Sequence, residues 1–89
     1  MEPLTPEDIG LIVRLLLVLN DMNDKSLVDN GIFNQKYAAS CVLNGKRYSD
    51  YLEISRLSEF FKVDAGNFFS KTYLENVKAV ILGGSNPLS

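Results

Sequence analysis

The sequence predicts an all-α domain of five helices. Apolar residues recur at spacings of three and four along most of the chain, and no stretch alternates with the two-residue period of a strand. Clusters rich in Asn, Asp and Gly separate the apolar stretches and supply the start and stop signals of successive helices. The chain has 89 residues, of which 46% are hydrophobic and 22% charged, as expected for one globular domain. We expect this domain to span residues 1–84 and a flexible polar tail to follow at 85–89.

The first helix is expected to begin at Pro6 and to end around residues 20–23. Thr5 can cap its first turn, and Pro6 suits the first helical position because the amide it lacks would have no partner there. The run 9–19 is apolar on more than one face, which predicts a broadly buried helix. It is too short to span a membrane, is interrupted by Arg14, and follows acids where a signal peptide carries positive charge. We therefore expect a cytoplasmic protein without a membrane partner.

Two short helices are predicted next. The first covers residues 25–29 and stops at Asn30-Gly31, and the apolar pair Ile32-Phe33 after it is expected to fill the space between the two helices. The third helix of the chain is expected at about 34–44, with Asn34 as its N-cap and Asn44-Gly45 as its stop. Its outer face is polar. Its inward positions are Ala39, Val42 and Leu43.

The last two helices are strongly apolar. The fourth is predicted over about 50–62, with Ser49 or Asp50 as its cap, and its apolar residues return to one side: Leu52, Ile54, Leu57, Phe60 and Phe61. The fifth is expected to run without a break from a cap at Asp64 to Gly83. It has more apolar residues than a core of this size needs, which predicts a homodimer interface at Tyr73, Leu74, Val77, Val80 and Ile81. The alternative is that this helix folds back on the first one.

Charge is distributed unevenly along the chain. The formal net charge is -2, but residues 25–47 hold four cations against the single acid Asp29 and therefore carry +3. Affinity for nucleic-acid phosphates comes mainly from Lys and Arg. A nucleic-acid contact would therefore lie in this third of the chain.

The segment from the third helix onward resembles the helix-turn-helix of the Cro and phage-repressor (XRE) family. The matching features are a short polar helix ending in N-G-K-R, then L-E-I-S-R-L-S-E-F-F, then V-D-A-G-N-F-F. The segment L-S-E-F-F-K-V-D-A-G-N-F-F is also similar to the mycobacterial EspR group. The resemblance covers roughly residues 8–70 and is most specific over 43–69. It implies a five-helix Cro/repressor-like domain whose third helix enters the major groove, in a dimeric, sequence-specific regulator of transcription.

The resemblance also implies which residues contact double-stranded DNA. The expected set is Lys25, Gln35, Lys36, Tyr37, Ser40, Asn44, Lys46 and Arg47. Within it, Lys36 can donate to guanine and Gln35 can pair with adenine, whereas Lys46 and Arg47 take the place where the helix end meets phosphates. Cys41 falls near the same face, where its thiol is either a sensor of oxidation or a small hydrophobe. The family's second helix opens with a phosphate-binding Gln, which this chain lacks.

Other functional classes find little support in the residues. The chain has no His, no Gly-rich phosphate loop, no pair of Cys and no carboxylates at metal-ligand spacing, so we expect neither an enzyme nor a metal or cofactor site. The single Cys41 excludes an internal disulfide. The alternative function is a helix-turn-helix fold used for protein contact, as an adaptor, an antitoxin-like protein or an anti-repressor. The acidic balance, the missing Gln and the apolar fifth helix favour that alternative.

Overall fold

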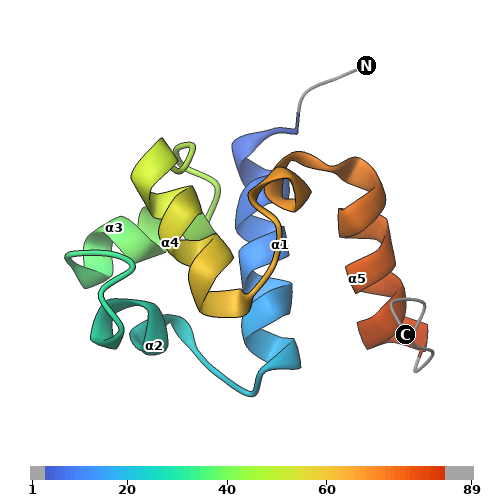
Figure 1. Ribbon diagram of the computed structural model, residues 1–89, viewed down its shortest axis with the longest axis horizontal. Coiled ribbons are helices and arrows are strands. Elements are labelled where there is room, and N and C mark those ends of the chain that lie inside the picture. The colour runs from blue at the N-terminus through green and yellow to red at the C-terminus, as the bar shows by residue number, and fades with distance from the viewer. Residues whose placement is uncertain (1–3, 84–89) are drawn as a thin grey trace.

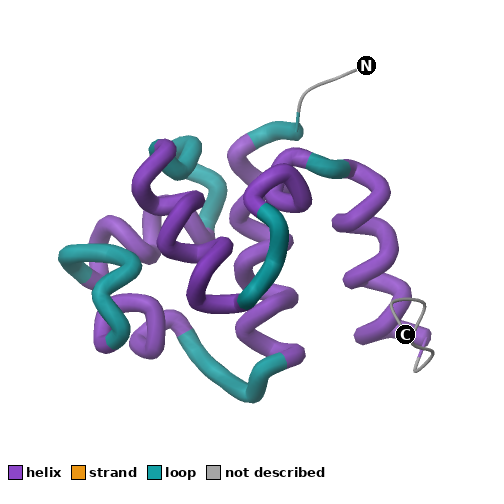
Figure 2. The backbone as a smooth tube through the Cα atoms, in the orientation of Figure 1, coloured by secondary structure: helices purple, strands orange, loops and turns teal. Residues whose placement is uncertain are grey.

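The structure is a computed structural model and describes residues 4–83. Within these residues all the regular secondary structure is helical (Figure 1). The all-α prediction is therefore confirmed, whereas the expected tail at 85–89 lies outside the described residues. The elements in chain order are α1 (Pro6–Leu19), α2 (Asp24–Asp29), α3 (Lys36–Leu43), α4 (Tyr51–Phe61), the 3-10 helix η1 (Ala65–Phe69) and α5 (Lys71–Gly83). Figure 2 shows that the two longest loops, 30–35 and 44–50, lie on either side of α3 in the chain. No helix within residues 4–83 is long and apolar enough to cross a membrane.

Helix α1 is the scaffold on which the other elements are placed. Its first turn is closed by the predicted cap: the Thr5 hydroxyl accepts from the Asp8 amide at 3.2 Å, and the Asp8 carboxylate accepts from the Thr5 amide at 3.3 Å. Both α3 and α5 pack along α1, as Figure 1 shows, and η1 also contacts it. Ile12 and Val13 in the middle of α1 are completely buried. The broad apolar surface of this helix is thus covered from several sides.

Gly10 sets the distance between α1 and α3. A Cβ atom at this position would overlap the carbonyl oxygen of Val42 and would lie 2.9 Å from that of Leu43. The last turn of α3 therefore rests directly on the backbone of α1. Only glycine permits this approach, because any side chain would push α3 away.

The buried side of α3 agrees with the sequence prediction. Ile32 and Phe33 are each 2% exposed, so the apolar pair before α3 does fill the core. Their amides both donate to the carbonyl oxygen of Leu27, which ties the loop to the last turn of α2. The inward positions of α3 are all buried, and they are Ala39, Val42 and Leu43. Helix α3 is therefore held from beneath and exposes its opposite face.

Two predicted helix starts need correction. Helix α3 begins at Lys36 with Gln35 at the N-cap position, not with Asn34, since Gln35 is extended and its carbonyl oxygen accepts from the Ala39 amide. The predicted continuous fifth helix is interrupted: Ser70 is extended after η1, and its hydroxyl accepts from the Tyr73 amide at 3.1 Å. Ser70 thereby starts α5 as a new helix. For α4, the cap is Asp50, whose side chain accepts from the Glu53 amide.

One apolar position on α4 also differs from the prediction. Leu52 is 60% exposed, although it was expected to share the buried side of the helix. The buried residues of α4 include Ile54 and Leu57, three residues apart on one face. Leu52 is two positions before Ile54, which turns it away from that face because each residue advances the helix by about 100°.

Helix α5 packs back on α1, which was the alternative to a dimer interface. Leu74 and Val77 are 1% and 0% exposed within a single chain. Side chains buried in this way offer little surface to a second copy, so these two positions do not support the predicted dimer interface. Tyr73, Val80 and Ile81 are partly exposed, and their role at an interface stays a prediction.

Candidate nucleic-acid interface

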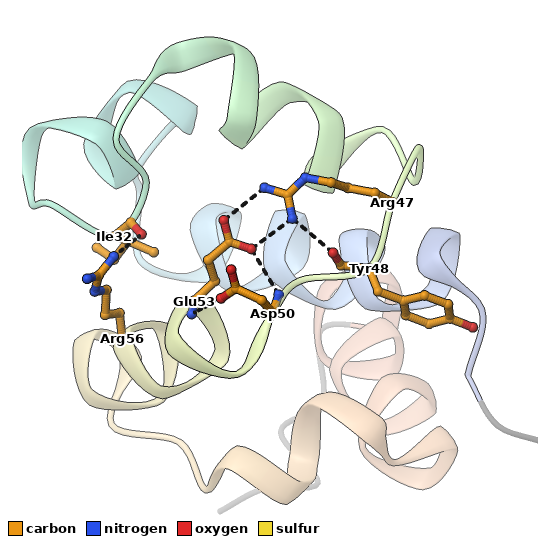
Figure 3. Close-up of polar contacts among 6 residues, drawn as sticks. All are labelled: Ile32, Arg47, Tyr48, Asp50, Glu53 and Arg56. Carbon is orange, nitrogen blue, oxygen red and sulfur yellow. Dashed lines mark hydrogen bonds and ion pairs between the residues drawn. The ribbon is translucent and has the colours of Figure 1, made fainter.

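Helices α2 and α3 with their connecting loop form the candidate site. The loop leaves α2 at Asn30, whose side chain donates to the carbonyl oxygen of Ser26 at 2.7 Å. Gly31 follows with a φ of +77°, a left-handed conformation that favours glycine. On the far side of the loop, Arg56 of α4 donates to the carbonyl oxygen of Ile32 at 3.5 Å (Figure 3). The start of α3 is therefore anchored to both α2 and α4.

The outer face of α3 is polar and free of acids. Tyr37 is 75% exposed, and Gln35 and Lys36 beside it are also exposed. Residues 30–49 contain no Asp or Glu. The Gln35 side chain makes no hydrogen bond that caps the first turn of α3, so it does not offset the partial positive charge of this helix end. An anionic ligand is favoured at such an end.

Two of the predicted lysines meet at one hollow between α2 and α3. Lys25 and Lys36 line a hollow of about 250 Å³ together with Val28 and Asp29. The fold thus brings together two cations that are 11 residues apart in the sequence. Asp29 in the same hollow reduces their combined potential without cancelling it.

Arg47 is placed differently from the prediction. Its guanidinium forms a two-pronged ion pair with Glu53, at 2.8 Å from Nη2 to Oε2 and 2.9 Å from Nη1 to Oε1 (Figure 3). Nη1 also donates to the carbonyl oxygen of Tyr48, and the carboxylate accepts from the Asp50 amide at 3.0 Å. The hydrogen bond to Glu53 raises the pKa of Arg47 above its ordinary value, although desolvation acts in the opposite direction. The Arg47 side chain therefore fixes the loop 44–50 instead of facing solvent as an unpaired cation.

Asn44 and Ser40 are tied to α1. The Arg14 guanidinium donates to Oδ1 of Asn44 at 2.7 Å, and Nδ2 of Asn44 donates to the Ser40 hydroxyl at 3.0 Å. Asn44 remains exposed and Ser40 half-buried, so both keep access to a ligand in a fixed orientation. Cys41 is half-buried as well, which leaves its two interpretations open.

The sequence analysis did not predict the roles of Glu53 and Arg14, which position Arg47 and Asn44. The spacing of Asp50 and Glu53 is that of a capping box, and this signal could have predicted a part-buried carboxylate at the end of the 44–50 loop. No local pattern links Arg14 to Asn44, since 30 residues separate them. Within residues 4–83, no group of three or more His, Cys, Asp or Glu side chains is arranged to hold a metal ion.

Comparison with models of protein families, with curated proteins and with solved structures finds no match to this chain.

Proposed function

We propose that this protein binds double-stranded DNA with α3 in the major groove and acts as a sequence-specific regulator of transcription. The observation that carries the proposal is the acid-free outer face of α3, flanked by Lys25, Lys36 and Lys46. All three lysines are exposed. Arg47–Glu53 is the one ion pair found within residues 4–83, so these lysines are not neutralised by partners in the described chain.

The dimensions of α3 suit this role. An α-helix with its side chains is about 10–12 Å across, and the major groove is about 12 Å wide, so the eight-residue α3 can enter it. Lys36 and Gln35 stand at the end of the helix that would enter first, where their side chains reach base edges. Tyr37 next to them offers an apolar ring to a thymine methyl or a sugar. Lys46, in the loop after α3, and Lys25, on α2, would contact the phosphates on either side.

A salt titration tests this proposal. Fluorescence anisotropy with a labelled random-sequence duplex should show affinity that falls as salt rises, with a logarithmic slope of about -0.9 for each phosphate neutralised. Lys25 and Lys46, the two lysines placed at phosphates in each chain, then give a slope of about -1.8 per chain. The absence of binding at low salt would overturn the proposal.

Single substitutions assign the contacts. Lys46→Ala should weaken binding to all sequences alike and reduce the slope by about 1, whereas Lys36→Ala should relax the preference at one base pair of a selected site. Lys71→Ala is the matched control, because it removes the same charge from an exposed position on α5. If the control reduces the slope as much as Lys46→Ala does, the contact is not located on the α3 side.

A second function is favoured by a specific observation at α2. Asp24 occupies the first turn of that helix, where it opposes a phosphate at the same place. Together with the net charge of -2, this favours a protein partner for the α2–α3 face. The 75% exposed ring of Tyr37 would then act as an anchor in a pocket of the partner. The same titration separates the two functions, since a protein-contact module shows no salt-dependent affinity for duplex DNA.

A further inference from the structure

We propose that two copies of this chain associate through a groove beside the C-terminal half of α1. This α1 groove has a volume of about 270 Å³ and is lined by Arg14, Leu17, Val18, Met22, Asp24 and Leu43. This association occurs in the free protein and does not depend on DNA binding. It replaces α5 as the main dimer surface, because Leu74 and Val77 are enclosed by the core.

Exposed apolar side chains gather at this groove. Among the described residues, four large non-aromatic apolar side chains are exposed, and three of them lie in the segment 18–22: Val18 at 62%, Leu19 at 42% and Met22 at 41%. The fourth, Leu52, lies on α4. Val18 and Met22 line the α1 groove themselves, so each copy carries both protruding apolar groups and a hollow next to them. Burying such a cluster against another protein surface is favourable.

The charges at the groove fit a second copy of the chain as the partner. Arg14 and Asp24 both line the groove, but they do not form an ion pair with each other. In a two-fold symmetric interface, residue i of one copy contacts residue j of the other, and j contacts i. Arg14 of each copy then faces Asp24 of the other, which makes two equivalent ion pairs around the apolar centre. A partner carrying charge of one sign would satisfy Arg14 or Asp24 but repel the other.

The groove continues along α1, as an interface requires. A neighbouring hollow of about 300 Å³ shares Arg14 and Leu43 with it and extends past Leu11 to Glu7. The surface available to a second copy therefore follows one side of α1 over most of the helix. Arg14 lies between the two hollows, and its side chain is held by the hydrogen bond to Asn44.

Sedimentation velocity of the full 89-residue chain without DNA tests the proposal. The sedimentation coefficient should rise from that of one chain to that of two chains as the protein concentration increases. Val18→Asp places a charge at the apolar centre and should raise the dimer dissociation constant by about tenfold or more. Leu52→Asp is the matched control: the native side chain is 60% exposed against 62% for Val18, and its substitution should leave the constant unchanged. Circular dichroism melts establish that both variants remain folded.

Charge reversal then tests the pairing itself. Arg14→Asp and Asp24→Arg should each weaken self-association, because each variant brings like charges together twice. An equimolar mixture of the two variants should form a heterodimer with the affinity of the wild-type dimer, and the double variant should again form a homodimer. A chain that stays monomeric at all concentrations overturns the proposal. So does an equal effect of Val18→Asp and Leu52→Asp, or a mixture of the charge variants that does not associate.

Discussion

The ion pair between Arg47 and Glu53 should stabilise the fold. Glu53→Gln removes a carboxylate that accepts two hydrogen bonds from the guanidinium and one from the Asp50 amide. Losing one partner costs about 3–5 kcal/mol for a fully buried pair, and an exposed pair contributes only about 0–1 kcal/mol. Here the side chains of Glu53 and Arg47 are 11% and 39% exposed, which places the cost between these limits. We expect Glu53→Gln to lower the free energy of unfolding by about 2 kcal/mol and the Tm by about 8–16 °C.

A double-mutant cycle isolates the energy of the pair. Urea unfolding followed by circular dichroism gives the free energy of unfolding for Arg47→Met, Glu53→Gln and the double variant. Since the two side chains contact each other, the effects of the single changes should not add, and the coupling energy should be about 1–2 kcal/mol. A coupling below about 0.5 kcal/mol would refute the reasoning, because independent sites add to within that range.

The same pair predicts how two adjacent cations differ in DNA binding. Lys46 is exposed and has no ion-pair partner within residues 4–83, whereas Arg47 is paired with Glu53. Lys46→Met should therefore reduce the salt slope of DNA binding by about 1, and Arg47→Met should change it by clearly less. The titrations are made at a temperature where both variants are folded. Equal reductions of the slope would mean that Arg47 leaves Glu53 to neutralise a phosphate.

Further predictions concern the backbone and one partly buried phenol. Gly10→Ala should destabilise the protein by more than about 2 kcal/mol in urea unfolding, because the new Cβ meets the Val42 carbonyl oxygen. Gly66→Ala is the control and should change the stability little, because a Cβ there would meet no atom within 4 Å. Similar effects of the two substitutions would contradict the close approach of α1 and α3. Lys62→Gly should raise the free energy of unfolding by about 0.5–1 kcal/mol, because Lys62 ends α4 with a φ of +56°; a decrease would show that its side chain contributes more than the strain costs. Burial raises the pKa of Tyr73, so the native state holds the phenol proton more tightly than the unfolded chain does. The resulting contribution to stability is complete below a pH of about 10 and is lost as the pH rises above it. Tyr73→Phe should flatten this alkaline decline in urea unfolding, and an unchanged decline would exclude Tyr73 as its source.

Local rules predicted the elements that depend on neighbours in the chain. The cap at Thr5 and one of the two candidate caps of α4, Asp50, are present because capping involves an amide only three residues away. The burial of Ile32 and Phe33 followed from their strong hydrophobicity between two polar stretches. The break at Ser70 was missed, because the apolar residues on both sides of it fit a continuous helix equally well.

The candidate site was predicted in part. Composition located the positive third of the chain, and Lys36 and Lys46 are exposed there. The sequence analysis gave Lys46 and Arg47 the same role, although within residues 4–83 Arg47 alone of the two has a carboxylate acceptor. That acceptor, Glu53, lies on the next helix, and the bend of the 44–50 loop decides that the two side chains meet. The surface around α3 therefore has one cation fewer than the sequence suggests.

The sequence by itself determined the all-α class, the approximate helix boundaries and the acid-free stretch around α3, because each of these depends on local spacing and composition. Only the tertiary structure decided which apolar surfaces remain exposed. Helix α5 buries Leu74 and Val77 against the core, whereas Val18 at the end of α1 and Met22 in the following loop remain exposed to solvent. Both regions are apolar in sequence. The difference arises because burial depends on which helices pack side by side, and that is set by contacts between residues far apart in the chain, such as the approach of α3 to Gly10.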